Sequence, residues 1–178
     1  MQPELRAGKL IFIDESGFDV KMTRRFGRAR SGAPCIGTVP FGRWGNNTLI
    51  AGLRMDGPCA PMLMQGAMNG GWFCHWVETQ LAPSLAEGDI VICDNLSVHK
   101  NKRARAASEA KGAELRVLPP YSPDLNPIEQ AFAKIKGMVR GLAPRCFDTL
   151  CEAIKTALNA INQQECANYI QNSGYVPT

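Results

Sequence analysis

The sequence predicts an α/β fold in which helices flank a mixed five-stranded β-sheet. Two apolar runs, LIFID at 10–14 and IVICD at 90–94, are continuous rather than alternating, which is typical of central strands covered on both faces. Between them, the runs at 47–55 and 59–66 flank the turn DGP and predict a hairpin. Helical patterns follow the hairpin and the second apolar run, and one more strand and a further helical pattern come after them. The predicted order is therefore strand, hairpin, helix, strand, helix, strand, helix.

The remaining elements follow from local signals. Pro61 cannot donate a ladder hydrogen bond, so the second hairpin strand is expected at a sheet edge or a bulge. Residues 69–85 predict a helix, and residues 99–111 a short basic helix that Gly112 ends. A strand is expected at 114–119 and amphipathic helices at 126–140 and 147–162. We expect a main domain over residues 1–145 and a C-terminal helical extension over 146–178 that packs on it.

Length and cysteine content limit the class of protein. The 178 residues suit one hydrophobic core. The seven cysteines form neither a CxxC pair nor a zinc-ligand spacing. No apolar run approaches a membrane span and no signal-peptide pattern opens the chain. We therefore expect a cytoplasmic protein with reduced thiols and no membrane partner.

Positive charge is concentrated in two segments. No Asp or Glu occurs between Val20 and Met55, and a second basic segment lies near residue 100. A single run of this kind is usually a solvated face, whereas two runs favour a polyanionic partner. The cations concerned are Lys21, Arg24, Arg25, Arg28, Arg30, Arg43, Lys100, Lys102 and Arg103.

Aspartates end both apolar runs. Asp14 and Asp94 would share a crevice if their strands pair, because the carboxyl ends of neighbouring strands converge there. Two adjacent carboxylates repel each other unless one is protonated or a cation bridges them, and oxygen ligands suit Mg²⁺ or Mn²⁺. Each residue also has a plain interpretation, Asp94 as a turn former and Asp14 as an ordinary strand-end acid.

Glu129 is the candidate third carboxylate of a two-metal site. The proline-rich segment PPYSPDLNP restricts the chain that leads to it. Asn126 and Pro127 also fit the N-cap and first helical position, which would make Glu129 the acid of a capping box. The two interpretations differ in whether the carboxylate faces the cap or the crevice. On the same helical stripe, Lys136 and Arg140 could follow a phosphate track.

Three segments in order, IFIDESGF, ICDNLSVHK and LPPYSPDLNPIEQAFAKIK, resemble the catalytic domain of DDE transposases from the bacterial insertion-sequence branch of the Tc/mariner superfamily. The resemblance covers about residues 9–140 and includes the family's spacing of 34 residues between Asp94 and Glu129. It implies a ribonuclease H-like fold, with Asp14, Asp94 and Glu129 as catalytic residues that bind two Mg²⁺ or Mn²⁺ ions.

The resemblance also implies an activity and partners. It implies DNA cleavage at transposon ends followed by strand transfer, in this family at TA dinucleotides, by a homodimer assembled on DNA. Relatives carry a long loop after the first strand that contacts DNA or a partner subunit, so the basic residues there are candidate phosphate contacts. Asn95, His99 and Asn126 are candidate supporting residues.

Two departures from the family leave alternatives open. Relatives usually carry helix-turn-helix domains ahead of this region. We therefore expect this chain to work with a separately encoded recognition domain, to be an isolated catalytic domain, or to be a remnant of a transposase. Phe132 stands where relatives tend to have tryptophan. A non-catalytic DNA-binding or assembly remnant and a ribonuclease H-like nuclease are the alternatives to a transposase. Nucleotide binding is disfavoured because neither GxGxxG nor GxxxxGK[ST] occurs.

Overall fold

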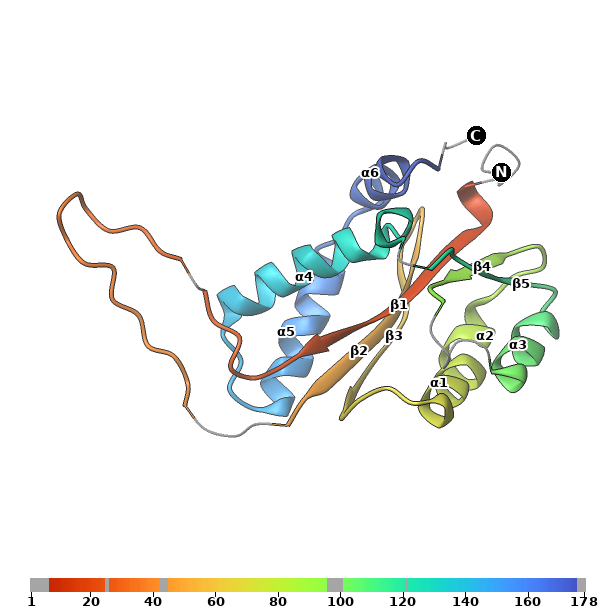
Figure 1. Ribbon diagram of the computed structural model, residues 1–178, viewed down its shortest axis with the longest axis horizontal. Coiled ribbons are helices and arrows are strands. Elements are labelled where there is room, and N and C mark those ends of the chain that lie inside the picture. Colours follow the sequence, from red (N-terminus) through yellow and green to blue (C-terminus); the bar gives the residue numbers. More distant parts are fainter. Residues whose placement is uncertain (1–6, 25, 42–44, 96–100, 121, 176–178) are drawn as a thin grey trace.

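A computed structural model describes residues 7–24, 26–41, 45–95, 101–120 and 122–175. Its sheet has five strands in the order β3-β2-β1-β4-β5 (Figure 1). β1 pairs antiparallel with β2, as does β2 with β3, while β1–β4 and β4–β5 are parallel. The predicted mixed five-stranded sheet is therefore confirmed. The strands are β1 (Leu10–Phe18), β2 (Asn47–Arg54), β3 (Gly57–Gln65), β4 (Ile90–Cys93) and β5 (Glu114–Val117).

Helices cover both faces of this sheet (Figure 1). On one face lie α4 (Ile128–Leu142), α5 (Phe147–Asn159) and α6 (Gln163–Asn172). On the other lie α1 (Gly70–Trp76), the π-helical turn η2 (Val77–Leu81), α2 (Ala82–Ser84) and α3 (Lys102–Glu109). Short 3₁₀ turns, η1 (Ala7–Lys9) and η4 (Pro123–Leu125), precede β1 and α4. The face with α4–α6 is the one that bears the candidate site.

β1 is the central strand and alternates between two cores. Phe12 packs in the cluster with α4–α6, whereas Ile11 and Ile13 pack in the cluster with α1 and η2. The continuous apolar run therefore marks a strand buried on both faces, as predicted. β1 is longer than the predicted 10–14, because its second half continues to pair with β2 as far as Phe18.

Several element boundaries differ from the predictions. The helix expected at 69–85 is divided into α1, η2 and α2. The helix expected at 147–162 ends at Asn159, because Asn162 caps α6 and forms a capping box with Glu165. β3 is an edge strand with a register shift opposite Ile50–Gly52, so both expectations about Pro61 are confirmed. Gly112 follows α3 in the left-handed conformation, at φ +73°.

The C-terminal helices share the main core. Leu150 and Ile154 of α5, Ile170 of α6 and Tyr175 are buried in the same cluster as Phe12. The division at residue 145 stays a prediction. Across the described ranges, every helix is too short or too polar to cross a lipid bilayer.

The connection from β1 to β2 projects from the body as an extended arm (Figure 1). Its described residues, 19–24, 26–41 and 45–46, form no helix or strand. The apolar side chains of Phe26, Ile36, Val39 and Phe41 are exposed there, Phe41 completely. Arg145 holds the base of the arm by donating from Nη1 to the carbonyls of Val20 and Met22.

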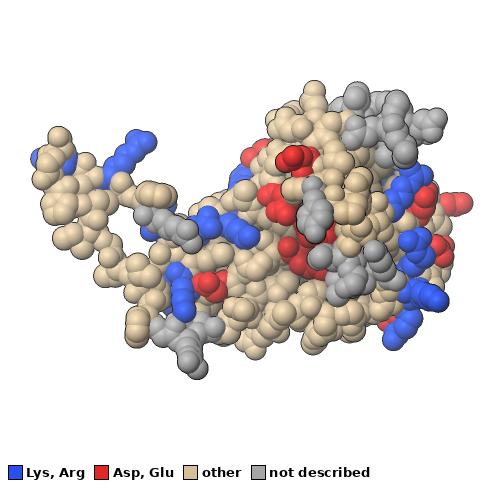
Figure 2. Space-filling view, in the orientation of Figure 1, with Lys and Arg blue, Asp and Glu red and all other residues tan. Residues whose placement is uncertain are grey.

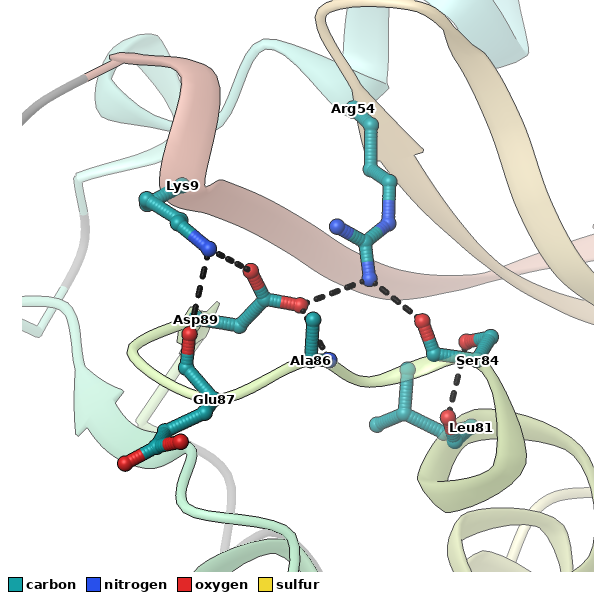
Figure 3. A network of polar contacts seen from close by, with 7 residues as sticks. All are labelled: Lys9, Arg54, Leu81, Ser84, Ala86, Glu87 and Asp89. Carbon is teal, nitrogen blue, oxygen red and sulfur yellow. Dashed lines mark hydrogen bonds and ion pairs between the residues drawn. The ribbon is translucent and has the colours of Figure 1, made fainter.

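A buried carboxylate joins three elements at the amino-terminal end of β1 (Figure 3). Asp89 is 2% exposed and lies just before β4. Its Oδ2 accepts from Arg54 Nη2 at 2.9 Å and from the Ala86 N–H at 2.8 Å. Lys9 Nζ lies 3.8 Å from Oδ1 and also donates to the Glu87 carbonyl. The cluster therefore fixes how β1, β2 and β4 meet, away from the candidate site.

Asp89→Ala should lower the free energy of unfolding by about 3 kcal/mol, because Arg54 would keep a largely buried charge without its partner. Urea denaturation measures this change. Glu114→Ala, which breaks an exposed pair with Arg116, is the matched control and should cost less than about 1 kcal/mol. Equal effects of the two substitutions would contradict the structural role of Asp89.

Candidate active site

Asp14 and Asp94 occupy equivalent positions on neighbouring parallel strands. β1 and β4 pair from Leu10 with Ile90 to Phe12 with Ile92. Each aspartate follows the last of these paired residues by two positions, so both carboxylates belong to the same face as Phe12. The predicted pairing of the two strands is confirmed, and it brings both acids near the carboxyl end of β4, where the charge of Asp94 acts on Asp14.

The environment of Asp14 is unfavourable to its negative charge. The residue is 8% exposed, and burial is the main reason that its pKa rises to about 8. The Glu15 N–H donates to Oδ1 at 2.7 Å and lowers the pKa. The charges of Glu129, Glu15 and Asp94 raise it. Three acids therefore act electrostatically on Asp14, and a cation beside it would favour its ionised form.

Asn126 is turned toward β1 rather than toward α4. Its Nδ2 donates to Asp14 Oδ2 at 3.2 Å, and the residue is 4% exposed. The predicted N-cap is therefore wrong: α4 begins after Pro127 without a side-chain cap. The turn η4 explains the orientation, because its hydrogen bond from the Asn126 N–H to the Pro123 carbonyl (2.8 Å) closes the chain just before α4.

The capping-box interpretation of Glu129 is wrong for the same reason. The Asn126 N–H that it would accept from is already bonded to Pro123, and no side chain caps α4. Glu129 instead lies exposed in the first turn of α4, where the helix dipole favours a carboxylate. Its charge acts on Asp14. The two residues are brought together from distant parts of the chain.

An open pocket beside Glu129 includes residues that the sequence analysis did not select. Asn126 and Glu129 line it together with Gln130 of α4 and with Asn172 and Ser173 at the end of α6. No motif marks the α6 residues as part of a site. The signal that points to them is their packing against α4, which sequence periodicity does not specify.

The donor chemistry of the site fits a hard divalent cation. Carboxylate and amide oxygens are the ligands of Mg²⁺ and Mn²⁺. Among the described residues, Asn126 Oδ1 is buried and has no hydrogen-bond partner, so it is an acceptor that a cation or its water could satisfy. Within the same part of the chain, no three His, Cys, Asp or Glu side chains are grouped so that they could hold one ion.

Basic residues approach from the arm and from α4. Lys21, Arg24 and Arg140 line one pocket at the base of the arm. The Arg24 guanidinium lies beside Gly141, 3.2 Å from where a β-carbon there would be. Lys136 Nζ lies 5.9 Å above the ring of Phe18. These contacts bring the base of the arm and α4 together into one basic surface.

The other predicted DNA-binding residues are spread more widely. Arg28 and Arg30 are exposed on the arm, and Lys102 and Arg103 are exposed on α3, where Arg103 pairs with Glu78 at 2.9 Å. In Figure 2, acidic side chains gather near the middle of the displayed face, and Lys and Arg lie on both sides of them. Asn95, next to Asp94, is half-buried. The predictions on Arg25, Arg43, His99 and Lys100 fall outside the described residues.

The chain is similar to known proteins in sequence profile and in fold. A family profile described as DDE superfamily endonuclease matches residues 9–151. No curated protein is significantly similar to the chain in sequence.

Several solved structures share the fold at low sequence identity. The Mos1 transposase paired-end complex with left transposon end has a TM-score of 0.72 and 16% identity, over 96% of this chain and 53% of that one. The Mos1 mariner paired-end complex with Mn has a TM-score of 0.68 and 16% identity, over 96% and 53%. The catalytic domain of Mos1 mariner transposase has a TM-score of 0.63 and 14% identity, over 96% and 78%. The chain spans about half the length of the Mos1 chains in the paired-end complexes.

Asn126→Ala should lower the free energy of unfolding by about 1–3 kcal/mol, because it leaves Asp14 Oδ2 buried without its donor. Urea denaturation provides the measurement. Asn159→Ala, at the exposed end of α5, should change the same quantity by less than about 0.5 kcal/mol. An Asn126→Ala protein as stable as this control would show that the bond to Asp14 contributes nothing.

Proposed function

The chain belongs to the DDE superfamily of endonucleases, and from that premise we propose that it is the catalytic domain of a transposase. It would cleave DNA at transposon ends and join the 3′ ends to target DNA. The observation that carries the proposal is the placement of Asp14 on β1 and of Asp94 directly after the neighbouring parallel strand β4. Asn126 donates a hydrogen bond to Asp14, and the charge of Glu129 acts on it, although both lie more than a hundred residues further along the chain. We assign it to the bacterial insertion-sequence branch of the Tc/mariner superfamily, which joins DNA at TA dinucleotides.

Asp14, Asp94 and Glu129 would hold Mg²⁺ or Mn²⁺, two ions in all. The buried carboxylate of Asp14, whose pKa the charges of Glu129 and Asp94 raise, supports this assignment, as do the Mos1 paired-end complexes with Mn and with Mg. When bound, the cations lower the pKa of the attacking hydroxyl and stabilise the negative charge on the leaving oxygen. The acids are not preassembled around one ion among the described residues, so ligand binding is expected to draw them closer.

The protein's own contribution is to orient the acids. Both oxygens of Asp14 accept a hydrogen bond, Oδ1 from the Glu15 N–H and Oδ2 from Asn126. These two donors fix the plane of the carboxylate and favour its ionised form, because an ionised carboxylate only accepts. Glu129 is held at a helix N-terminus, which stabilises its charge. Positioning of this kind is a large part of the catalysis of phosphoryl transfer.

DNA would run from the acids along α4 toward the arm. Lys136 and Arg140 lie further along the helix that begins with Glu129, and Arg140 lines a pocket with Lys21 and Arg24 of the arm. Contacts of this kind to phosphates set the register of a duplex without reading its sequence. A homodimer on DNA and a separately encoded helix-turn-helix domain would supply end pairing and recognition. The match to a transposase paired-end complex with a transposon end supports DNA as the partner.

Mn²⁺ binding and nicking of a supercoiled plasmid should both be lost in Asp94→Asn, because the substitution removes a negative oxygen ligand. Calorimetry with and without DNA measures the binding. A gel assay with Mn²⁺ measures the nicking rate, which is expected to fall by at least about 10²-fold. Glu129→Gln is expected to behave in the same way.

Asp148→Asn is the matched control, because Asp148 is an exposed acid in the first turn of α5, as Glu129 is in the first turn of α4, and lies outside the candidate site. It should bind Mn²⁺ and nick DNA at the wild-type rate. A folded wild-type protein that binds no Mn²⁺ even with DNA would contradict the enzyme and favour the non-catalytic remnant. Nicking that survives in Asp94→Asn would contradict the assignment of this acid.

Replacing Arg24, Arg28 and Arg30 with alanine should reduce the slope of log K against log salt by about 2–3, because each phosphate contact contributes roughly 0.9. Fluorescence anisotropy with duplex DNA at several salt concentrations measures the slope. The control replaces Lys111, Arg116 and Lys155, three exposed cations outside the predicted DNA surface, and makes the same change in net charge. If both triple variants shift the slope equally, the arm does not contact DNA specifically.

A further inference from the structure

Tyr175 contacts both halves of the candidate site. Its ring meets the ring of Phe12 edge to face, with centroids 4.7 Å apart and an interplanar angle of 62°. Its hydroxyl donates to the Leu125 carbonyl at 2.9 Å. Phe12 precedes Asp14 by two residues on β1, and Leu125 directly precedes Asn126. One side chain, 4% exposed, therefore touches both the strand that carries Asp14 and the turn that leads to Glu129.

The end of α6 explains how Tyr175 reaches this position. Gly174 has φ +86°, in the left-handed region that favours glycine. The Gly174 N–H donates to the Gln171 carbonyl and the Tyr175 N–H to the Ile170 carbonyl, which is the Schellman pattern of a helix end. The chain therefore reverses after α6 and places Tyr175 over Phe12.

Gln130 makes a second connection between the same two segments. Its Nε2 donates to the Tyr169 carbonyl at 3.2 Å and to Ser173 Oγ at 3.3 Å, and its Oε1 accepts from Asn172 Nδ2 at 3.3 Å. Gln130 directly follows Glu129 in the first turn of α4. The segment that holds Asn126 and Glu129 is thus tied down on both sides, by the Leu125 carbonyl that accepts from Tyr175 and by the Gln130 side chain that bonds to the end of α6.

We propose that Tyr175 is a positioning residue for the catalytic acids. Through Leu125 it fixes the turn that sets Asn126 and Glu129 relative to Asp14, and Gln130 reinforces the same connection. The inference deepens the proposed function and rests on it. Displacing one reacting group by about 1 Å costs up to 10²-fold in rate, so a single hydrogen bond at this place can matter for turnover while it contributes little to DNA binding.

The test compares Tyr175→Phe with Tyr169→Phe. The first removes the hydroxyl that bonds Leu125 and keeps the ring on Phe12. The second makes the same chemical change on α6, where the Tyr169 hydroxyl forms no hydrogen bond with any described residue. Two quantities are measured for each variant and for the wild type. One is amide hydrogen exchange of Glu129 and Gln130 by NMR, which needs no activity, and the other is kcat and KM for Mn²⁺-dependent plasmid nicking.

Tyr175→Phe should speed exchange of the Glu129 and Gln130 amides by roughly 5- to 10-fold. It should lower kcat on the order of 10-fold with KM for DNA unchanged. Tyr169→Phe should match the wild type in both quantities. Unchanged exchange in Tyr175→Phe would overturn the inference, and so would a loosened turn with unchanged kcat, because the bond would then be structural only.

The experiments distinguish failure of the proposed function from failure of the inference about Tyr175. A wild-type protein that neither binds Mn²⁺ nor nicks DNA would refute the enzyme, whatever Tyr175 does. In that case the exchange rates alone decide whether Tyr175 holds the turn: faster exchange in Tyr175→Phe than in Tyr169→Phe supports that part, and equal exchange refutes it.

Discussion

Burial of an ionisable carboxyl group in the middle of the central strand is the constraint that the surrounding residues satisfy. Asp14 follows four fully buried apolar residues and lies under α4, where its charge costs free energy unless donors or a cation compensate for it. The Glu15 N–H and the Asn126 side chain supply two donors. Asn126 lies 112 residues from Asp14 in the sequence. The compact turn before α4 and the packing of α4 on β1 are therefore both needed to bring its side chain within hydrogen-bond distance of Asp14.

The sequence predicted the parts of the site that depend on local patterns. Continuous apolar runs identified β4 and the first half of β1, and the acids that end these runs followed from the convergence of parallel strands. Asp94 directly follows β4, whereas Asp14 lies within β1 rather than at its end. Helical periodicity predicted an amphipathic helix at 126–140, and the structure shows Ile128, Phe132 and Val139 on the buried face of α4. A resemblance in three short segments added the family and the expected ribonuclease H-like sheet, and the profile match over residues 9–151 confirms the DDE superfamily.

The sequence could not show what depends on side-chain direction in three dimensions. Asn126 before Pro127 fits the local pattern of a helix cap, yet its Nδ2 donates to Asp14. A buried carboxylate oxygen without that donor would carry a desolvation penalty. Tyr175 and Gln130 carry no motif. Their contacts exist only because α6 packs across α4, and amphipathic periodicity specifies which face of a helix is buried but not which neighbour covers it.

The distance along the chain between the members of this site has a consequence for folding during synthesis. A nascent chain completed as far as Gln130 contains Asp14, Asp94 and Glu129 but neither α6 nor Tyr175. Closing the site requires pairings of high sequence separation, such as that of Tyr175 with Leu125 and Phe12, and such contacts form slowly. The chain order therefore delays the finished arrangement of the acids until after α6 has been translated. The sheet can thus form earlier in synthesis than the complete candidate site.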